Sequence, residues 1–225
     1  MSAHPRVIVG TANWNDLRGF YPRGMERSNK LAYYGSRLTG LEVNATFFRM
    51  QAPEIVSKWV EQTPQDFMMS LKAQRVISAW VRNPGKADQR VFDRHLAMAQ
   101  PLIEASKFAG YVIRLPGHMS RPHNIERSIA VLREGFADLP LIVDGPMALD
   151  QDLRADVNQA LRDSGITKAR HDLTCSGEGI GDLTGLAYFR FGGADLVSGR
   201  SSQRAICSDR EILERADVVE ATVRS

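Results

Sequence analysis

The sequence predicts a single α/β domain in which parallel strands alternate with helices around a barrel. Strand-like apolar runs and amphipathic segments follow one another along the 225 residues, joined by short loops, as in repeated βαβ units. About seven strands and a similar number of helices come close to a TIM-like (β/α) barrel, which has eight strands and usually takes about 250 residues. No linker or change of composition divides the chain, so residues 1–225 are expected to form one domain.

The first half of the chain carries the most regular pattern. A β-branched run closed by Gly10 predicts a buried first strand over 6–12, and an aromatic-rich loop follows it. Ser28 is expected to cap the first helix, and Pro53 to occupy the first turn of the second. Further elements of this half are expected strands at 41–46, 67–73 and 110–116, and a long amphipathic helix at 88–107.

The second half repeats this rhythm. Helices through 125–132 and 149–161 accompany strands at 141–145 and 166–173; a glycine-rich turn at 177–185, a strand at 186–192 and a last helix at about 209–223 follow. A doubly wound open sheet is the alternative fold. The run from Gly177 to Gly181, however, lacks the third glycine of the GxGxxG signature and precedes a strand instead of a helix.

Composition and charge exclude several classes of protein. The net charge of +3 and the pI of about 9.0 permit contact with nucleic acid but are too small to favour it. No apolar run approaches the ~20 residues of a membrane span, and the start of the chain has no signal-peptide pattern. The lack of such a run predicts no contact with a membrane. The two cysteines, Cys175 and Cys207, form no CxxC motif, and we therefore expect a cytoplasmic protein.

The stretch from Leu41 to Met50 is the most informative part of the chain. In its first six residues, apolar side chains alternate with Glu42, Asn44 and Thr46. Strand side chains alternate between the two faces, so these three polar residues are expected to share one face of a strand. Buried polar groups must find partners or lose their hydration, and a carboxylate, an amide and a hydroxyl in one row are therefore typical of a face that points into a site.

Several short motifs in the first third of the chain are specific. They are Val9-Gly10-Thr11-Ala12-Asn13-Trp14, Phe20-Tyr21-Pro22, Tyr33-Tyr34, Leu41 through Arg49 (LEVNATFFR), Trp59, Thr63-Pro64, Phe67 and Ser70-Leu71-Lys72-Ala73. In these motifs the chain resembles the YecE-like proteins, a TIM-barrel family of unknown function. Val112 to Pro116 looks like the fourth strand of that family, and Tyr188 to Gly192 looks like its YxRxHG strand. The resemblance implies a TIM barrel and leaves the activity open.

The chain also departs from the pattern of this family. Arg114 stands where a glutamine is usual, and Gly193 stands where a histidine is usual. Val143 to Pro146 replaces a Glu-x-Arg-His strand, so that Asp144 remains as a pocket carboxylate without the arginine. The last strand of the family, with its paired asparagines, is missing. The resemblance therefore implies a barrel of about seven strands whose chemistry is altered or lost.

Polar residues near the carboxyl ends of different barrel strands meet at one face, and this convergence defines the predicted site. The catalytic candidates are Glu42 and Lys72, and the substrate-binding candidates are Trp14, Asn44, Arg114, Asp144 and Arg190. Glu42 and Lys72 on neighbouring strands either exchange protons with a substrate or, in the simpler interpretation, neutralise each other inside the barrel. The arginines suit a phosphate or carboxylate, whereas Trp14 either stacks on a sugar or base or belongs to the core.

A metal site is a further hypothesis. Glu42, Asp144, His171 and Asp172 come from three strand ends, and mixed carboxylate and imidazole ligands suit Zn²⁺ or Mn²⁺. No local spacing motif supports this hypothesis, so no metal ligand is assigned and the cofactor is left unknown.

Two classes of function follow from these observations. The first is an enzyme that acts on a small anionic ligand, phosphorylated or sugar-like, at the carboxyl face of the barrel. Hydrolysis of a nucleic-acid phosphodiester is a variant of it that rests on fold analogy alone. The second is a non-catalytic ligand-binding or interaction protein that kept the pocket after losing the last strand. A homodimer that covers the open edge of the barrel is a hypothesis about partners.

Overall fold

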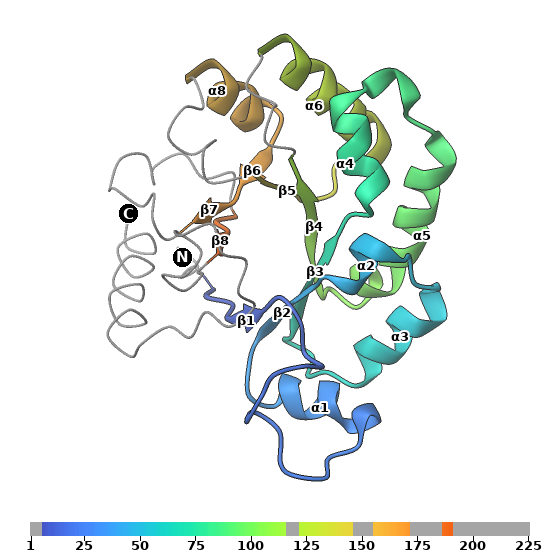
Figure 1. Cartoon of the computed structure of the whole chain (residues 1–225), viewed down its shortest axis with the longest axis vertical. Coiled ribbons are helices and arrows are strands. Elements are labelled where there is room, and N and C mark those ends of the chain that lie inside the picture. Colours follow the sequence, from blue (N-terminus) through green and yellow to red (C-terminus); the bar gives the residue numbers. More distant parts are fainter. Residues whose placement is uncertain (1–5, 116–121, 146–154, 172–185, 191–225) are drawn as a thin grey trace.

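The computed structural model describes residues 6–115, 122–145, 155–171 and 186–190. Within these residues, six strands form one parallel sheet in chain order, and helices cover the outer side of the arc of strands (Figure 1). The predicted parallel α/β arrangement is therefore confirmed, whereas the sheet formed by the described strands is not closed. The six strands are β1 (Gly10–Thr11), β2 (Gly40–Val43), β3 (Met68–Lys72), β4 (Phe108–Arg114), β5 (Leu141–Asp144) and β6 (Ile166–Lys168).

Two further short strands extend this arrangement. β7 (Arg170–His171) follows β6 after the single residue Ala169 and pairs in parallel with β8 (Phe189–Arg190). Ala169 donates its N–H to the carbonyl of Val143 on β5 at 2.8 Å, whereas the first residue of β7 donates to the carbonyl of Tyr188 at 2.9 Å. The extended run from β6 to β7 thus joins β5 on one side to β8 on the other.

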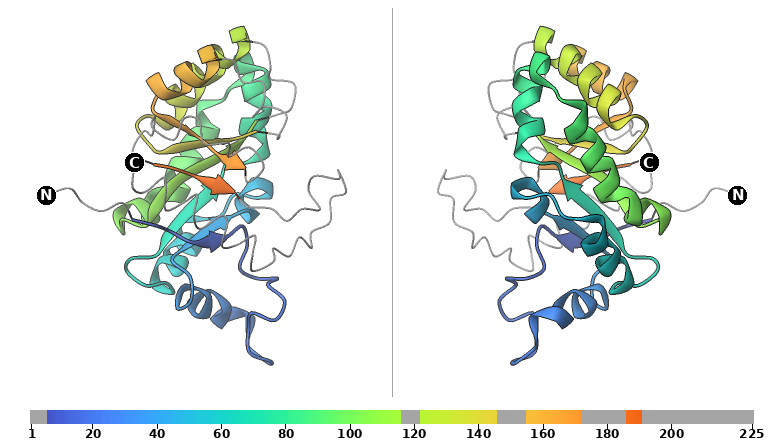
Figure 2. Two further views of the ribbon diagram at one scale, coloured as in Figure 1. Left: turned by 90° about the vertical axis from the view of Figure 1, so that its left-hand side faces the viewer. Right: turned by 90° about the vertical axis from the view of Figure 1, so that its right-hand side faces the viewer.

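The helices pack against the sheet and enclose the core between the two layers. The side views show the parallel strands pointing towards the same end of the molecule, where the loop after β1 also lies (Figure 2). The core between sheet and helices includes the fully buried side chains of Tyr34, Phe67, Leu71, Tyr111 and Phe136. The described helices are η1 (Arg27–Asn29), α1 (Lys30–Gly35), α2 (Ala45–Phe48), α3 (Pro53–Glu61), α4 (Arg75–Arg82), η2 (Pro84–Lys86), α5 (Gln89–Glu104), α6 (Pro122–Phe136) and α8 (Ala155–Asp163).

The helix boundaries follow local signals in part. Pro53 occupies the first turn of α3, as predicted. The side chain of Asp88 caps α5 by accepting the N–H of Arg90 at 3.0 Å. α5 ends at Glu104, earlier than predicted, because Ser106 adopts a positive φ of 56° and turns the chain towards β4.

Two predictions for the N-terminal part are wrong. Only two residues of the first strand pair with β2, and Val7, Ile8 and Val9 are 49%, 39% and 57% exposed instead of buried. The reason is that β1 is an edge strand, with a partner on one side only in the described sheet. Ser28 does not cap α1 but lies within η1, where its hydroxyl contacts the carboxylate of Glu26 at 3.4 Å.

The central strand also ends earlier than predicted. β2 stops at Val43, and Asn44 has the helical backbone angles φ −73° and ψ −23° at the start of α2. Thr46 therefore does not share the face of Glu42. Its hydroxyl lies 2.8 Å from the carbonyl of Val43 and 2.7 Å from that of Lys72. These contacts tie the carboxyl ends of β2 and β3 together and fix the backbone of Lys72 beside that of Glu42.

The remaining predicted elements differ in how far the structure describes them. α4 was not predicted from the sequence. The strands predicted at 67–73 and 141–145 are confirmed with shorter bounds, and the strand predicted at 110–116 lies two residues earlier. The glycine-rich turn at 177–185 and the last helix at 209–223 lie outside the described residues.

A buried histidine supports the backbone next to β3. His95 on α5 has no exposed surface, and its Nε2 accepts the N–H of Gln74, two residues after Lys72, at 3.1 Å. Its Nδ1 lies 2.7 Å from the carbonyl of Val91 and therefore carries the proton of a neutral ring. Burial lowers the pKa of His95 and outweighs the opposite effect of the Val91 carbonyl.

This arrangement predicts a dependence of stability on pH. Because folded His95 stays neutral, the unfolded chain binds more protons below the ordinary histidine pKa of about 6.5, and the free energy of unfolding falls as the pH drops through that range. In His95→Gln we expect this fall between about pH 7 and about pH 5 to be shallower. Urea unfolding of both proteins at several pH values measures the two slopes. Equal slopes would show that His95 takes up its proton as easily in the folded as in the unfolded chain.

Candidate functional site

Four charged side chains from four strands meet on the inner face of the sheet. Glu42 comes from β2, Lys72 from β3, Asp144 from β5 and Arg190 from β8. The exposed fractions of these side chains are 5%, 10%, 11% and 24% in that order. Charges that are removed from water need partners of opposite sign, and the two carboxylates here balance the two cations. We call these four residues the Glu42 cluster.

Strand alternation places these residues on one face. Glu42 lies beside Ser70 in the parallel register, and Lys72 lies beside Val112. Val112 belongs to a small inner cluster of buried apolar residues that is separate from the large core beneath the helices. Because side chains alternate along a strand, Ser70 and Lys72 share the inner face with Glu42.

The Glu42 carboxylate is the centre of the cluster. Nη1 of Arg190 lies 2.9 Å from its Oε1 and 2.7 Å from its Oε2, and the hydroxyl of Tyr188 donates to Oε2 at 2.5 Å. Nζ of Lys72 lies 3.4 Å from Oε1, longer than the about 2.7–2.9 Å of a charge-assisted hydrogen bond. Lys72 is therefore the most loosely held partner, and Glu42 has little free acceptor capacity in this arrangement.

Tyr188 and Arg190, from the region of β8, are suited to bind this carboxylate. Burial by itself lowers the pKa of Arg190, but the carboxylates of Glu42 and Asp144 outweigh burial and raise that pKa. The Asp144 Oδ2 lies 3.3 Å from Nη1 of Arg190. Burial and the neighbouring Glu42 charge raise the pKa of Tyr188, so its phenol remains a proton donor.

Tyr188 is the site residue that sequence reasoning missed. It precedes Arg190 by two residues, and its hydroxyl also lies 3.5 Å from Oγ of Ser70. The period of two along a strand was the available signal, because it places both residues on the same face.

Two other predicted site residues lie at the same edge of the sheet but outside the cluster. Oδ1 of Asn44, directly after β2, is buried and has no hydrogen-bond partner among the described residues. Arg114 ends β4 in register with Asp144 and is exposed. In the part of the chain that the structure describes, no hydrogen bond or ion pair joins either of them to Glu42.

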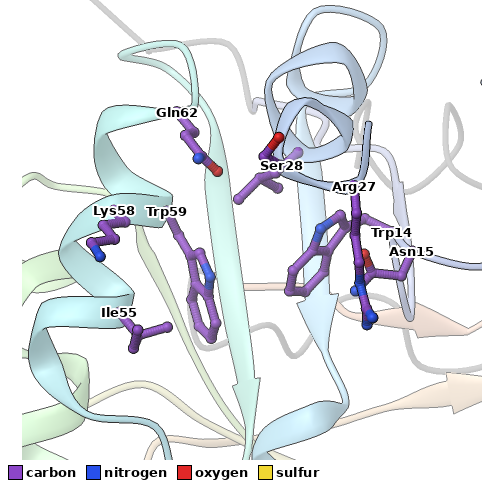
Figure 3. A pocket seen from close by; sticks show the side chains of 9 residues that line it. Trp14, Asn15, Arg27, Ser28, Ile55, Lys58, Trp59 and Gln62 are labelled. Carbon is purple, nitrogen blue, oxygen red and sulfur yellow. The ribbon is translucent and has the colours of Figure 1, made fainter. Parts of the chain in front are cut away.

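Trp14 lies in a different place from the one predicted. It lines a hollow of about 340 Å³ between the loop after β1 and α3, and no residue of the Glu42 cluster lines that hollow (Figure 3). Its ring centroid is 5.7 Å from that of Trp59, with an angle of 71° between the ring planes. We call this space the tryptophan hollow. The structure thus unites Glu42, Lys72, Asp144 and Arg190 and places Trp14 apart from them.

The described residues offer no set of metal ligands. Among them, no three His, Cys, Asp or Glu side chains are grouped closely enough to hold a metal ion. Arg190 lies between the carboxylates of Glu42 and Asp144 instead. Asp172, which belonged to the metal hypothesis, lies outside the described residues, as does the side chain of His171. No helix in the described part has the length and apolar character needed to cross a membrane.

Replacement of Tyr188 by Phe tests the cluster, because it removes one donor from Glu42 and keeps the ring. A hydrogen bond to a charged group contributes about 1.5–3 kcal/mol, so the free energy of unfolding is expected to fall by about that amount. The raised pKa of Tyr188 also means that stability falls above about pH 10, where the unfolded tyrosine ionises first, and that Tyr188→Phe loses less there. Urea denaturation at neutral and alkaline pH measures both effects. An unchanged midpoint together with an unchanged alkaline slope would contradict the contact.

Solved structures of other proteins share the fold. A DUF72 family protein from Thermotoga maritima MSB8 matches with a TM-score of 0.78 and 20% identity, covering 96% of this chain and 87% of that chain. A DUF72 family protein from Enterococcus faecalis V583 matches with a TM-score of 0.71 and 20% identity, covering 88% of this chain and 82% of that chain. At such identities the likeness concerns the fold alone.

Sequence comparison identifies the family. The curated "UPF0759 protein YunF" of Bacillus subtilis (strain 168) is 26% identical over 112 residues, which are 49% of this chain and 40% of that protein. The alignment therefore spans less than half of this relative. The profile of the family described as "Protein of unknown function DUF72" matches residues 8–222. Because this match covers nearly the whole sequence, the chain belongs to the DUF72 family.

Proposed function

We propose that the protein is an enzyme that binds a small anionic molecule, phosphorylated or sugar-like, at the carboxyl ends of its parallel strands. The Glu42 cluster is the observation that supports this proposal most directly. Burying paired charges costs desolvation energy, and well-packed apolar residues of similar volume often make a protein at least as stable. Stability alone therefore does not explain the cluster, which favours a role in binding or catalysis. Ligands of parallel α/β proteins bind at this end of the strands, where such residues converge.

Lys72 is the residue that we propose to meet the anionic group. It is the most loosely held partner of Glu42, at 3.4 Å, and an incoming phosphate or carboxylate competes with Glu42 for its ammonium group. Movement of Lys72 towards the ligand removes one donor from Oε1 of Glu42 and leaves Nη1 of Arg190 beside it at 2.9 Å. Glu42 then serves as a general base towards the substrate through Oε1. Arg190 meanwhile keeps Glu42 in place through both carboxylate oxygens and stays close to Asp144.

Asn44 supports a polar ligand at the same edge of the sheet. Its buried Oδ1 lacks a hydrogen-bond donor within the described residues, and such an unsatisfied acceptor costs about 1–3 kcal/mol. A hydroxyl or amide group of a ligand would satisfy it. The proposed role of Asn44 is therefore to orient the substrate beside Lys72.

We also propose that the strands curve into a barrel of the TIM type. Two observations support closure of this kind. The run from β6 to β7 leads from β5 to β8, and the Arg190 side chain of β8 reaches Glu42 of β2. A cytoplasmic location, which the cysteine content favours, belongs to the same proposal.

Thermal unfolding of the wild type, Lys72→Met and Lys107→Met tests the site. Inorganic phosphate, sugar phosphates, short oligonucleotides and divalent metal ions serve as probes. A ligand at 100 times its Kd stabilises the folded state by about 2.7 kcal/mol, which a melting shift resolves. We expect at least one anionic probe to stabilise the wild type and Lys107→Met clearly more than it stabilises Lys72→Met.

Lys107 is the matched control because it is a second buried lysine with a structural role. Its Nζ donates to the carbonyls of Val60 and Thr63 at 2.8 Å and 2.9 Å, on the core side of the sheet. The proposal is contradicted if every anionic shift is as large in Lys72→Met as in the wild type, or if no anion shifts the wild type. Once a ligand is known, turnover by the wild type that Glu42→Gln loses while it remains folded distinguishes an enzyme from a binding protein.

A further inference from the structure

One face of α3 forms a wall of the tryptophan hollow. Ile55, Lys58, Trp59 and Gln62 are spaced at i, i+3, i+4 and i+7, and so lie on the same side of the helix. Trp59 is 8% exposed and anchored in the core, whereas Lys58 and Gln62 are exposed. In Figure 3 the Trp59 indole and the Gln62 amide point from α3 towards the side of Trp14, whereas the Lys58 side chain extends away from Trp14, so that its ammonium group lies at the other side of the helix.

The opposite wall is the loop after β1, whose backbone is held in place by side chains. The hydroxyl of Tyr21 donates to the carbonyl of Trp14, and Nζ of Lys30 donates to the carbonyl of Asn15 at 2.8 Å. Oδ1 of Asn13 accepts the N–H of Asn15 at 3.0 Å. The loop is thus ordered before any ligand arrives, and binding requires little loss of conformational freedom.

The two indole rings, one from each wall, lie next to each other at the hollow (Figure 3). They form an edge-to-face pair, and Trp14 remains half-buried, so part of its ring is open. The face of an indole ring carries negative potential and attracts the apolar, slightly positive C–H face of a sugar ring.

The polar groups around the hollow are available to a ligand. Arg27 and Lys58 are exposed, and neither forms an ion pair within the described residues. None of the residues that line the hollow is acidic. The side-chain amides of Asn15 and Gln62 also line it, and such amides both donate to and accept from hydroxyl groups.

We infer that the tryptophan hollow is a second ligand site, for a ring of monosaccharide size that carries a phosphate or a carboxylate. In this site the ring packs on Trp14, the amides meet its hydroxyls, and one of the two cations at the rim, Arg27 or Lys58, binds its anionic group. A volume of about 340 Å³ lies at the small end of ligand pockets, which span about 300–1,000 Å³. The site shares no lining residue with the Glu42 cluster and stands independently of the function proposed there.

Tryptophan fluorescence of the full chain reports on this site. Two of the three tryptophans line the hollow, and the third, Trp80, packs against Phe92 in the core. Glucose 6-phosphate and glucuronate are expected to change the emission in a saturable way. Glucose and inorganic phosphate each carry only part of the recognised chemistry and are expected to bind at least about tenfold more weakly. Calorimetric titration with the same probes gives the affinities independently of the emission.

Matched variants locate the binding. At least one of Arg27→Gln and Lys58→Gln is expected to weaken binding of the anionic sugars about tenfold. Arg37→Gln, which removes an exposed cation that lies over the Tyr33 ring outside the hollow, is expected to keep the wild-type affinity. Trp80→Phe is expected to keep the emission change.

Lys72→Met separates this inference from the proposed function, because Lys72 does not line the hollow. It is expected to bind the anionic sugars at the hollow as the wild type does. A response that disappears in Lys72→Met would place the ligand at the Glu42 cluster and overturn the inference. The same holds if no probe binds the wild type by either measurement, or if Arg27→Gln, Lys58→Gln and Arg37→Gln all bind equally well.

Discussion

A carboxylate buried on the inner face of a sheet is the constraint on which the rest of this structure depends. Glu42 has lost nearly all contact with water, and an ionised carboxylate in such a place is tolerated only when donors surround it. Its donors come from β3 on one side and from the region of β8 on the other. The hydrogen bonds and ion pairs of this one side chain therefore join strands that are far apart in the sequence, and they stabilise both the sheet and the site.

The Glu42 cluster and the tryptophan hollow use charge in different ways. In the cluster the cations are already paired, so a ligand has to compete for Lys72, and only an anion of the right shape gains from doing so. In the hollow, Arg27 and Lys58 have no acidic neighbour among the lining residues and attract anions directly from solvent. The cluster thus favours selective binding of particular anions, whereas the hollow favours attraction of anions in general.

The alternation of side chains with a period of two predicted the inner face of the sheet well. Strands that pair in register keep their inward-facing residues on the same side, and Glu42 and Lys72 therefore meet as expected. The same pattern failed after Val43, where alternation continues in the sequence but the backbone turns into α2 and carries Thr46 away from the site. The place of Trp14 beside Trp59 depends on how α3 packs, which local patterns do not encode. The family motifs, by contrast, were sufficient to predict the parallel α/β arrangement, and the chain that carries them belongs to the DUF72 family.

The contact between Glu42 and Arg190 carries the central claim, and a double-mutant cycle tests it most directly. The free energies of unfolding of the wild type, Glu42→Gln, Arg190→Gln and the double variant give their coupling energy. We predict a coupling of about 1–3 kcal/mol, because each single change leaves a buried charge without its main partner and the double change removes both. Effects that add within about 0.5 kcal/mol would mean that the two residues do not interact, and would contradict the account of the site and of the curved sheet together.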